Sequence, residues 1–422
     1  MARLKANFFL LKAYAKLKTT MIKKLVKKIT PHFLLDFYHY LWAFAGAVVF
    51  GFPSRKLIVI GVTGTSGKST TVDFITRILE EAGHSIVSNS SIRFKIAGKE
   101  WPNNLKMGMP GRFFMQQFLR QGVKAGCNYA VLEVTSEGIR QSRHKFINFD
   151  TAVFTNLSPE HIESHGGFEN YRNEKLKLFR ATKNVHAINS DDENAEYFLE
   201  VPAGKIIKFG LGNGDVNMGN ARVELKVLGG FNQYNALAAI AVAKNYGISL
   251  ETCKRALEKV TGVPGRMEIV NKNPLVVVDY AHTPDQLEKV YKSLQGKKLI
   301  CVVGSCGGGR DKWKRPVLGK IASQYCDQII ITNEDPYDEN PLSIMNEIES
   351  GFSQTLNSKS ETLKYEKILD RRKAIKKAIQ SAKPGDTVII TGKGSELWMC
   401  VENGKKISWD DREIAKEAIS VR

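Results

Sequence analysis

Residues 57–73 constrain the fold of this chain more than any other stretch. They read Leu-Ile-Val-Ile-Gly-Val-Thr-Gly-Thr-Ser-Gly-Lys-Ser-Thr-Thr-Val-Asp. The apolar and mostly β-branched start predicts a buried strand, and apolar residues recur at helical spacing after the last glycine: Val72, Ile75, Ile78 and Leu79. A strand, a glycine turn and a helix start in this order predict an α/β sheet with an anion-binding turn at its edge.

The turn contains the residue types that a nucleotide phosphate requires. Glycines let backbone N–H groups approach an anion, and a lysine and a hydroxyl can reach the outer phosphates and a Mg²⁺ ion. The strict P-loop pattern has a glycine at the position that Val62 holds here, so a structural turn without a ligand is the alternative. We predict that ATP binds through the following residues: Gly64, Thr65, Ser66, Gly67, Lys68, Ser69 and Thr70.

Composition limits the classes of partner. The 422 residues suffice for two or three domains, and 43% hydrophobic with 25% charged residues is ordinary for a soluble protein. Six cysteines without metal-ligand spacing favour a reduced, cytoplasmic setting. The net charge of +19 suits nucleic acid, an anionic membrane surface or phosphate-bearing substrates. No nucleic-acid-binding signature accompanies this charge, so we expect no nucleic acid partner.

The first 52 residues form a segment of their own. Residues 1–30 read as a basic helix with nine Lys and Arg before the first acid, Asp36, and residues 33–52 are apolar and aromatic. The second run is about as long as a membrane span, but Asp36 and His39 interrupt it, and the basic residues would keep the N-terminus cytoplasmic and the ATP turn outside. Two interpretations remain open: a peripheral helix on the inner membrane surface, or a helix that packs on the protein through Leu34, Leu35, Leu41 and Val48.

Strand and helix patterns alternate through the rest of the chain. Residues 129–136 and 151–156 read as buried strands and residues 113–125 and 168–179 as helices, whereas residues 84–112 look irregular. A Pro-Gly break near residue 264 precedes a second alternating series. We predict an α/β fold of three parts: a short helical N-terminal segment (1–52), a central P-loop-containing domain (53–262) and a C-terminal doubly wound, Rossmann-like domain (263–422).

Three side chains outside the turn also suggest chemistry. Glu133 lies near the carboxyl end of a predicted strand, His161 follows the next one, and Lys175 lies in the helix after that. Carboxyl ends of parallel strands gather ligands in open α/β sheets. Taken singly, each residue also has an ordinary explanation, namely a buried acid, a histidine at a helix start and a solvated lysine.

Ordered motifs over almost all of residues 55–422 resemble the Mur ligase family, which makes amide bonds in cell-wall precursors. The similar runs are Thr63-Gly-Thr-Ser-Gly-Lys-Ser-Thr-Thr71, Val131-Leu-Glu-Val-Thr-Ser136, Thr155-Asn-Leu-Ser-Pro-Glu-His161, Tyr171-Arg-Asn-Glu-Lys-Leu-Lys-Leu-Phe179, Phe231-Asn-Gln-Tyr-Asn235, Pro264-Gly-Arg266 and Asp279-Tyr-Ala-His-Thr-Pro284. Two more are most similar to the MurE type, which adds the third amino acid to UDP-N-acetylmuramoyl-dipeptide: Cys306-Gly-Gly-Gly-Arg-Asp-Lys-Trp-Lys-Arg-Pro316 and Gly392-Lys-Gly-Ser-Glu396.

The resemblance implies a role for each matching residue. Mg²⁺ would be held by Ser69, Glu133, His161 and a carbamylated Lys175, since CO₂ converts a lysine without oxygen ligands into a carboxylate. Catalysis would rest on Lys68, His161, Lys175 and Arg266. Nucleotide contacts beyond the turn would come from Asn232, Asn235, Arg266, Asp279 and His282. Substrate contacts would come from Ser136, Arg143, Arg310, Glu334, Asp335, Tyr337, Gly392 and Glu396.

The departures from the family fall on substrate recognition. A MurE-type enzyme has a folded N-terminal domain for the uridine nucleotide, and its Thr-Thr-Pro substrate motif is replaced here by Met107-Gly-Met-Pro110. The Ser-His after the strand glutamate reads Ser136-Glu137. The diaminopimelate-type Asp-Asn-Pro-Arg motif reads Glu334-Asp-Pro-Tyr337, and a tyrosine cannot form the charged fork of an arginine.

We therefore expect a monomeric, ATP- and Mg²⁺-dependent ligase of MurE type that adds an amino acid to a muramoyl-peptide precursor. One alternative is a Mur-like ligase with a lipid-linked acceptor, held at the membrane by residues 1–52. An alternative of another class is a nucleotide-binding module without ligase activity.

Overall fold

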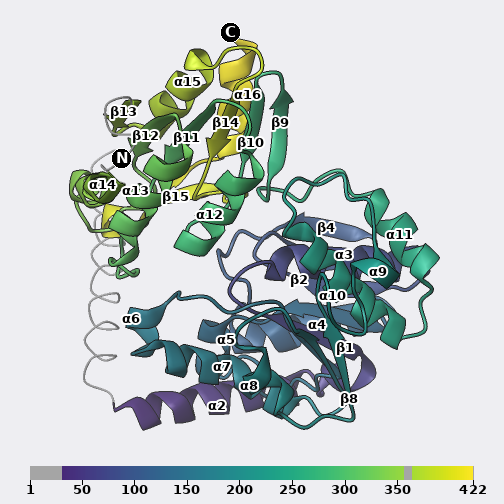
Figure 1. The fold of residues 1–422 in the computed structure, drawn as a ribbon. Helices are drawn as coiled ribbons and strands as arrows, with labels where there is room; N and C mark the ends of the chain where they lie inside the picture. The colour runs from purple at the N-terminus through teal and green to yellow at the C-terminus, as the bar shows by residue number, and fades with distance from the viewer. Residues whose placement is uncertain (1–30, 356–363, 422) are drawn as a thin grey trace, which may run out of the picture.

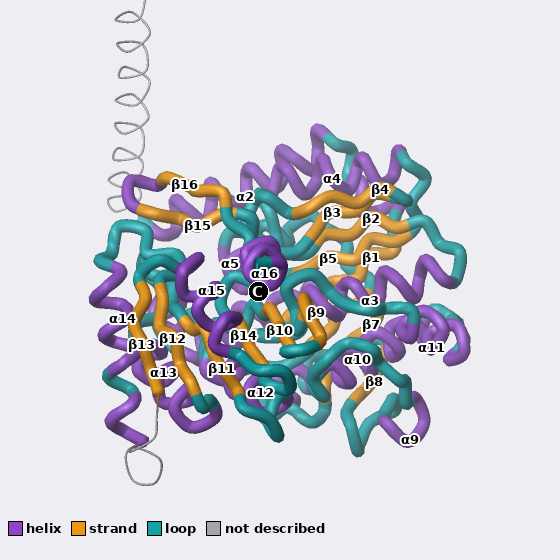
Figure 2. Tube along the Cα trace, turned by 90° about the horizontal axis from the view of Figure 1, so that it is seen from above, coloured by secondary structure: helices purple, strands orange, loops and turns teal. Residues whose placement is uncertain are grey.

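The computed structural model describes residues 31–355 and 364–421, and the predicted basic helix over residues 1–30 lies outside them. The chain forms two α/β bodies, each built on its own sheet (Figure 1). The first sheet uses strands from the first half of the chain, and the second uses strands from residue 268 onward. Figure 2 shows the two sheets side by side from above.

The first sheet has eight strands in the order β4-β3-β2-β5-β1-β6-β7-β8. β2, β5, β1, β6, β7 and β8 pair in parallel, whereas β3 and β4 continue the sheet antiparallel. Their bounds are Ile58–Thr63 (β1), Ile86–Asn89 (β2), Arg93–Ile96 (β3), Lys99–Pro102 (β4), Tyr129–Glu133 (β5), Thr151–Phe154 (β6), Val185–Asn189 (β7) and Lys205–Phe209 (β8). The expectation of an irregular stretch at residues 84–112 is wrong, because three short strands there extend the sheet edge.

Helices cover both faces of this sheet. On one face, α3, α10 and α11 share a core in which the predicted Val72, Ile75, Ile78 and Leu79 are all buried. On the other face, α4, α5, α7 and α8 enclose a second core. The helix bounds are Lys68–Glu81 (α3), Arg112–Lys124 (α4), Ser136–Arg140 (α5), Ile162–His165 (α6), Phe168–Ala181 (α7), Ala195–Leu199 (α8), Met218–Ala221 (α9), Asn232–Asn245 (α10) and Leu250–Glu258 (α11).

The second sheet has six strands in the order β13-β12-β11-β14-β10-β9, and only β9 is antiparallel. Their bounds are Glu268–Lys272 (β9), Leu275–Val278 (β10), Leu299–Val303 (β11), Gln328–Thr332 (β12), Lys364–Ile368 (β13) and Thr387–Ile390 (β14). α12 (Pro284–Ser293), α13 (Lys314–Tyr325) and α14 (Pro341–Glu349) cover one face; α15 (Arg371–Ser381) and α16 (Asp411–Ser420) cover the other. The second body also contains a hairpin of β15 (Trp398–Val401) and β16 (Lys405–Ser408). The described chain has three short 3-10 helices: η1 (Pro53–Lys56), η2 (Phe352–Thr355) and η3 (Glu402–Gly404).

Residues 33–52 mostly belong to α2 (His32–Val49), which lies along the lower edge of the molecule in Figure 1. α2 packs on α4 through small residues, since Ala43 and Ala47 are fully buried and a Cβ on Gly46 would lie 3.2 Å from Phe113 Cα. The expectation that Leu34, Leu41 and Val48 provide the packing is wrong, because these side chains are 45%, 45% and 50% exposed, and Leu35 is only half-buried. Within residues 31–355 and 364–421, no helix has both the length and the apolar character needed to cross a membrane.

Candidate active site

The glycine turn closes the gap between β1 and α3, as the sequence predicts. Gly64 has a φ of 148°, and a Cβ there would lie 1.9 Å from Thr155 Oγ1. Gly67 has a φ of 80°, and a Cβ there would lie 2.3 Å from Asn235 Oδ1. Both positions therefore need glycine for conformation and for space. Neighbouring strands fix the turn, because Thr65 N–H donates to Asn156 O (2.9 Å) and Ser66 N–H donates to Asn156 Oδ1 (2.9 Å).

Two lysines meet at the turn. Lys68 Nζ donates to Gly64 O (3.0 Å) and to Thr65 O (2.7 Å), and Lys175 Nζ donates to the same Gly64 oxygen (2.8 Å). Lys175 is buried on α7 with its ammonium 4.4 Å from the centre of the Tyr171 ring. Burial, with the charge of Lys68 beside it, lowers the pKa of Lys175 well below its ordinary value. The ordinary alternative for this residue, a solvated lysine, is therefore wrong.

Hard oxygen ligands gather at the first turn of α3. Glu133, at the end of β5, accepts hydrogen bonds at Oε2 from Ser69 Oγ (2.7 Å) and from Ser91 N–H (2.8 Å). Gly108 allows the preceding loop to pass close by, since a Cβ there would lie 2.4 Å from Glu133 Oε1. A buried carboxylate and a hydroxyl beside a phosphate turn fit the oxygen preference of Mg²⁺. Within the described part of the chain, no three His, Cys, Asp or Glu side chains cluster as a complete metal site.

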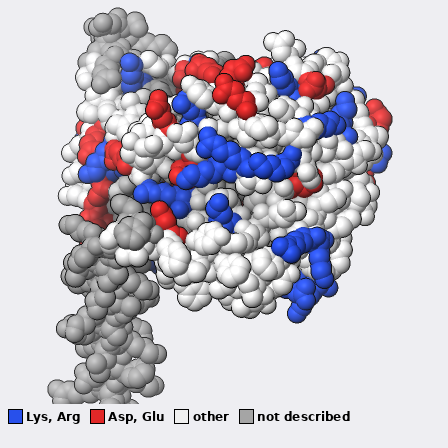
Figure 3. All heavy atoms as spheres, turned by 90° about the horizontal axis from the view of Figure 1, so that it is seen from below, with Lys and Arg blue, Asp and Glu red and all other residues white. Residues whose placement is uncertain are grey.

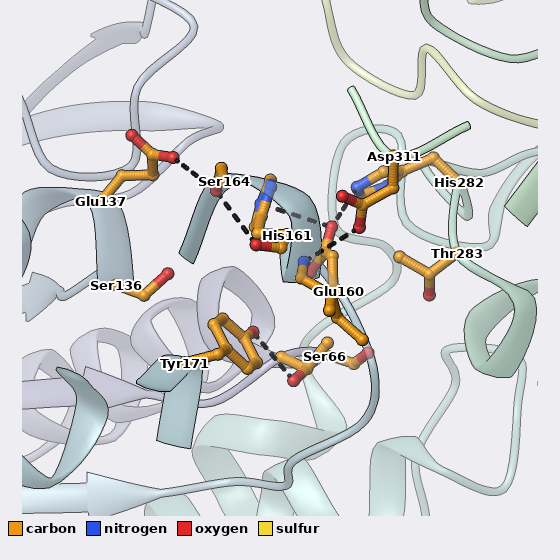
Figure 4. Close-up of polar contacts among 12 residues, drawn as sticks. Ser66, Ser136, Glu137, Glu160, His161, Ser164, Tyr171, His282, Thr283 and Asp311 are labelled. Carbon is orange, nitrogen blue, oxygen red and sulfur yellow. Dashed lines mark hydrogen bonds and ion pairs between the residues drawn. The ribbon is translucent and has the colours of Figure 1, made fainter. Parts of the chain in front are cut away.

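His161 belongs to a separate polar cluster between the two bodies (Figure 4). Its Nε2 lies 3.6 Å from Glu160 Oε1, and the same oxygen accepts a hydrogen bond from His282 Nε2 of the second body (2.7 Å). Burial opposes ionisation of Glu160, but His161 and His282 hold the pKa of this carboxyl well below its usual range. Burial lowers the pKa of His161 to about 4, which leaves its ring neutral at neutral pH.

Asp311 of the second body contacts the chain next to His161. Its Oδ2 accepts from Ile162 N–H (3.2 Å) and its Oδ1 accepts from Glu163 N–H (3.1 Å), at the start of α6. Figure 4 shows Asp311, His282 and Glu160 pointing toward one another, with Ser136 and Glu137 on the far side of His161. The contacts bring the loops after β6, β10 and β11 into one cluster.

The predicted nucleotide residues of α10 and of the second body also reach this region. Asn235 Nδ2 donates to Asn232 Oδ1 (2.9 Å), and Asn235 Oδ1 accepts from Thr71 Oγ1 (3.2 Å), which holds α10 against the turn. Arg266 stacks 4.2 Å from the centre of the Tyr280 ring. Asp279 uses both carboxylate oxygens on the backbone N–H groups of Met267 (2.7 Å) and Ala281 (2.6 Å), while burial raises its pKa.

The predicted substrate residues divide into two groups. Arg143 and Arg310 line the cavity described below. Arg143 Nη1 donates hydrogen bonds to Met109 O and Met107 Sδ. Ser136 contacts His165 Nε2 (3.2 Å) and is buried. Four others lie in the second body. Cys306 Sγ donates to Glu334 Oε1 (2.9 Å), and Lys393 Nζ donates to Asp335 Oδ1 (2.9 Å). Gly392 lies against Glu334, and Gly308 lies against Tyr337.

Glu396 and Asp335 take part in an ion-pair network that crosses between the bodies. Lys106, from the loop after β4, lies 2.7 Å from Asp335 Oδ2 and 2.6 Å from Glu396 Oε2. Lys393 lies 2.9 Å from Asp335 Oδ1 and 2.6 Å from Glu396 Oε2, and it is fully buried. Burial alone would lower the pKa of Lys106, but the two carboxylates raise it, so its ammonium stays charged in this network.

A cavity of about 670 Å³ joins these parts. This volume suits a nucleotide or a substrate of comparable size. Its walls come from both bodies and include most of the predicted residues: Thr65, Ser66, Gly67, Lys68, Ser69, Thr70, Glu133, Arg143, His161, Asn232, Asn235, Arg266, Asp279, His282 and Arg310. The predicted residues that do not line it are Gly64, Lys175, Ser136, Glu334, Asp335, Tyr337, Gly392 and Glu396.

The site also contains residues that were not predicted, and four of them form ion pairs or hydrogen bonds between the two bodies or beside those contacts. Glu160, Asp311 and Lys393 stand inside the very motifs that carry the resemblance, next to residues that were chosen, so the signal for them was present. Lys106 has no such signal, because nothing in the sequence pairs residue 106 with residues 335 and 396.

Family models match two parts of the chain. Residues 62–243 match the Mur ligase middle domain, and residues 265–394 match the Mur ligase, glutamate ligase domain. A UDP-N-acetylmuramoyl-L-alanyl-D-glutamate--2,6-diaminopimelate ligase of Geobacillus kaustophilus (strain HTA426) is 35% identical over 404 residues, which are 88% of this chain and 81% of that protein. A UDP-N-acetylmuramyl-tripeptide synthetase of Roseiflexus sp. (strain RS-1) is 36% identical over 415 residues, 89% and 81% of the two chains.

Solved structures agree with this result. A UDP-N-acetylmuramoyl-L-alanyl-D-glutamate--2,6-diaminopimelate ligase superposes with a TM-score of 0.58 at 31% identity, over 86% of this chain and 78% of that one. A Mycobacterium tuberculosis folylpolyglutamate synthase complexed with ADP and AMPPCP has the same fold at a TM-score of 0.65 and 15% identity, over 90% and 96% of the two chains. The chain therefore belongs to the Mur ligase family of ATP-dependent ligases.

Proposed function

We propose that this ligase adds an amino acid to a muramoyl-peptide precursor in peptidoglycan synthesis, through an acyl phosphate. The single observation that carries the proposal is the cavity between the two bodies, which joins the glycine turn to Arg143 and Arg310. The relatives at 35–36% identity have names that describe this class of reaction.

The reaction needs two displacements. A carboxylate oxygen of the acceptor peptide attacks the γ-phosphorus of ATP, the bond to the bridging oxygen breaks, and ADP leaves. The amine nitrogen of the incoming amino acid then attacks the acyl carbon, the carbon–oxygen bond to phosphate breaks, and the nitrogen loses a proton. Phosphoryl transfer depends mainly on positioning and on charge neutralisation. Lys68 and Arg266 both line the cavity and can supply positive charge to the transferred phosphoryl group.

The residues at the turn fit a Mg²⁺ ion. Ser69 Oγ and Glu133 Oε2 would hold it, because they already lie 2.7 Å apart next to the turn. Bound there, Mg²⁺ would neutralise phosphate oxygens. We include His161 in the proposed ligand set on family resemblance; its nearest carboxylate in the structure is Glu160.

We also propose that Lys175 is carbamylated. Its Nζ would form a bond to the carbon of CO₂ and lose a proton, giving an anion between Lys68 and the Tyr171 ring. The buried position of Lys175 and the shared contact with Gly64 O support this, since the carbamate would relieve the repulsion between two ammonium groups.

Phosphate release tests the proposal. Full-length protein is incubated with ATP, Mg²⁺, UDP-linked muramoyl dipeptide and single amino acids. We expect release that requires both the dipeptide and an amino acid, and Lys68→Ala should abolish it while Lys99→Ala, an exposed change on β4, should not. Undiminished turnover by Lys68→Ala, or nucleotide binding without turnover on either a UDP-linked or a lipid-linked dipeptide, would contradict the ligase mechanism and favour a binding module.

A second candidate differs only in how the acceptor is carried. The outward, apolar side of α2 favours a ligase that works at the inner membrane surface on a lipid-linked muramoyl peptide. The same assay separates the two candidates when the UDP-linked dipeptide is replaced by a lipid-linked one. A preference for the lipid-linked acceptor supports the second candidate, and a preference for the soluble one supports the first.

A further inference from the structure

α2 carries its large apolar side chains on the outside. Nine of them are 45% exposed or more: Leu34, Phe37, Tyr38, Tyr40, Leu41, Trp42, Phe44, Val48 and Val49. The side toward the protein has small residues, and Gly46 approaches Phe113 closely. Of the nine large side chains, Tyr40 and Phe44 also contact Phe146, and Trp42 contacts Phe113 at one ring edge. A helix that only completed the core would have the reverse arrangement, with its large apolar residues inward. Most monomers expose apolar residues singly, whereas here nine of them form one apolar surface along α2.

Charges around this face are almost all positive. The elements beside it are α2, η1, α4 and the loop 141–149, and together they contain one acid, Asp36, although the chain has 43. Asp36 is itself exposed, near the start of α2. The basic residues in these elements are Arg55, Lys56, Arg112, Arg120, Lys124, Arg143 and Lys145. Figure 3 views the molecule from below, the side on which α2 lies, and shows a broad uncharged surface with Lys and Arg, and some Asp and Glu, around it.

A groove at the C-terminal end of α2 combines both properties. It has a volume of about 470 Å³. Val48, Val49 and Phe50 line one side, and Arg120 and Lys124 of α4 stand on the other. An apolar wall facing two cations fits a molecule with an acyl chain and an anionic head.

We infer that the outward face of α2 docks on an anionic lipid bilayer. The chain that precedes α2 supports this choice over a protein partner, because residues 1–30 contain nine Lys and Arg and no acid, and they lead directly into the helix. Aromatic residues such as Trp42 and Tyr38 suit the boundary between head groups and acyl chains. α2 would lie along the surface with its large side chains in the bilayer and its small ones on α4.

A chain of side-chain contacts connects α2 to the cavity. His39 of α2 contacts Arg112, Arg112 Nε donates to Gln141 O (3.2 Å), and Arg143 Nη2 donates to Gln141 Oε1 (2.9 Å). Arg143 lines the cavity. The inference deepens the second candidate function, and its link to a lipid-linked acceptor rests on that function. Docking on a bilayer does not itself depend on ligase activity.

Flotation with vesicles tests the docking. Full-length protein is mixed with phosphatidylcholine vesicles, with and without phosphatidylglycerol, at low salt. We expect flotation only with phosphatidylglycerol and a loss of at least about tenfold in binding for the double variant Leu41→Glu/Val48→Glu. The matched control is Leu342→Glu/Leu369→Glu, whose positions are 51% and 45% exposed on the second body, and it should float like the wild type.

Trp42 provides the second measurement. Brominated phospholipids should quench part of the tryptophan fluorescence of the wild type, and Trp42→Phe should remove that quenching while flotation persists. The inference is overturned if the wild type does not float, if Leu41→Glu/Val48→Glu floats as well as the wild type, or if Trp42 is not quenched. Size-exclusion chromatography that shows a dimer lost in the same double variant would assign the face to a second copy instead. Lys68→Ala should float normally, so that failed docking and failed ligase activity are separable.

Discussion

Lys175 illustrates how one residue acquires chemistry from its surroundings. On the sequence it is one of several lysines in a polar helix, but the fold buries it against Tyr171 and the carbonyl oxygen of Gly64. Lys177, two residues later, is 48% exposed and pairs with Glu174 (2.5 Å). The two lysines therefore form a matched pair for mutation.

We expect Lys175→Ala to lower ligase turnover by at least about a hundredfold, because the proposed carbamate, an anion beside Lys68 and the phosphate turn, is lost. Acetate or propionate should restore part of the activity by replacing the carbamate. Lys177→Ala should retain nearly full turnover. Steady-state phosphate release with and without added carboxylate measures both effects, and full activity of Lys175→Ala would contradict the carbamate.

His144 gives a pH prediction at the same scale. It is 3% exposed, and burial lowers its pKa to about 3. An unfolded chain binds a proton on histidine near pH 6.5, whereas the folded protein does not, so stability is present above that value and is lost as the pH falls toward 3. Between about pH 7 and pH 5 this residue should contribute a loss of up to about 2 kcal/mol.

Urea unfolding at several pH values measures this loss. His144→Leu should flatten the decline relative to the wild type by that amount, even if its stability at neutral pH differs. Parallel declines for the two proteins would show that the buried ring is not responsible.

At the scale of elements, the turn between β1 and α3 depends on space as well as on conformation. Gly67→Ala would place a Cβ on Asn235 of α10, while Gly83→Ala at the end of α3 meets nothing within 4 Å. Both glycines have positive φ, 80° and 85°. The two variants therefore share backbone strain and differ in the steric clash.

We expect Gly67→Ala to lower ATP turnover at least about a hundredfold by displacing the turn from the phosphates. Gly83→Ala should keep turnover and lose about 1 kcal/mol of stability. Phosphate release and thermal unfolding of both variants provide the comparison. Equal turnover in the two variants would mean that the contact with α10 does not matter to the nucleotide.

At the scale of the whole molecule, Lys106 links the two bodies through Asp335 and Glu396. Closure of two bodies over a bound substrate keeps water from reactive intermediates. We expect Lys106→Met to lower kcat/KM about tenfold, corresponding to about 1–2 kcal/mol of lost interaction across the interface. Lys99→Met, on exposed β4 of the same body, serves as the control. Small-angle scattering should show a larger radius of gyration for Lys106→Met alone, and an unchanged radius would exclude the link.

The sequence alone determined the parts of this protein that depend on neighbours along the chain. The turn of residues 64–70 and a buried strand from Tyr129 follow from local periodicity and from residue chemistry, and the structure confirms them. The predicted strand over residues 129–136 is too long, because β5 ends at Glu133 and Ser136 begins α5. The Mur ligase resemblance also came from ordered local motifs, and the comparisons confirm it.

Tertiary structure decided what depends on distant residues. The strands at residues 86–102 are short and partly exposed, so their pattern is weak, and pairing at the sheet edge is what orders them. The partners of Lys106 lie more than two hundred residues away in the chain, and no local signal pairs them. α2 is apolar apart from a few residues such as Asp36 and His39, so its composition fits packing and membrane contact equally well. The close approach of Gly46 to α4 fixed which side faces the protein, and that contact left the large side chains outside.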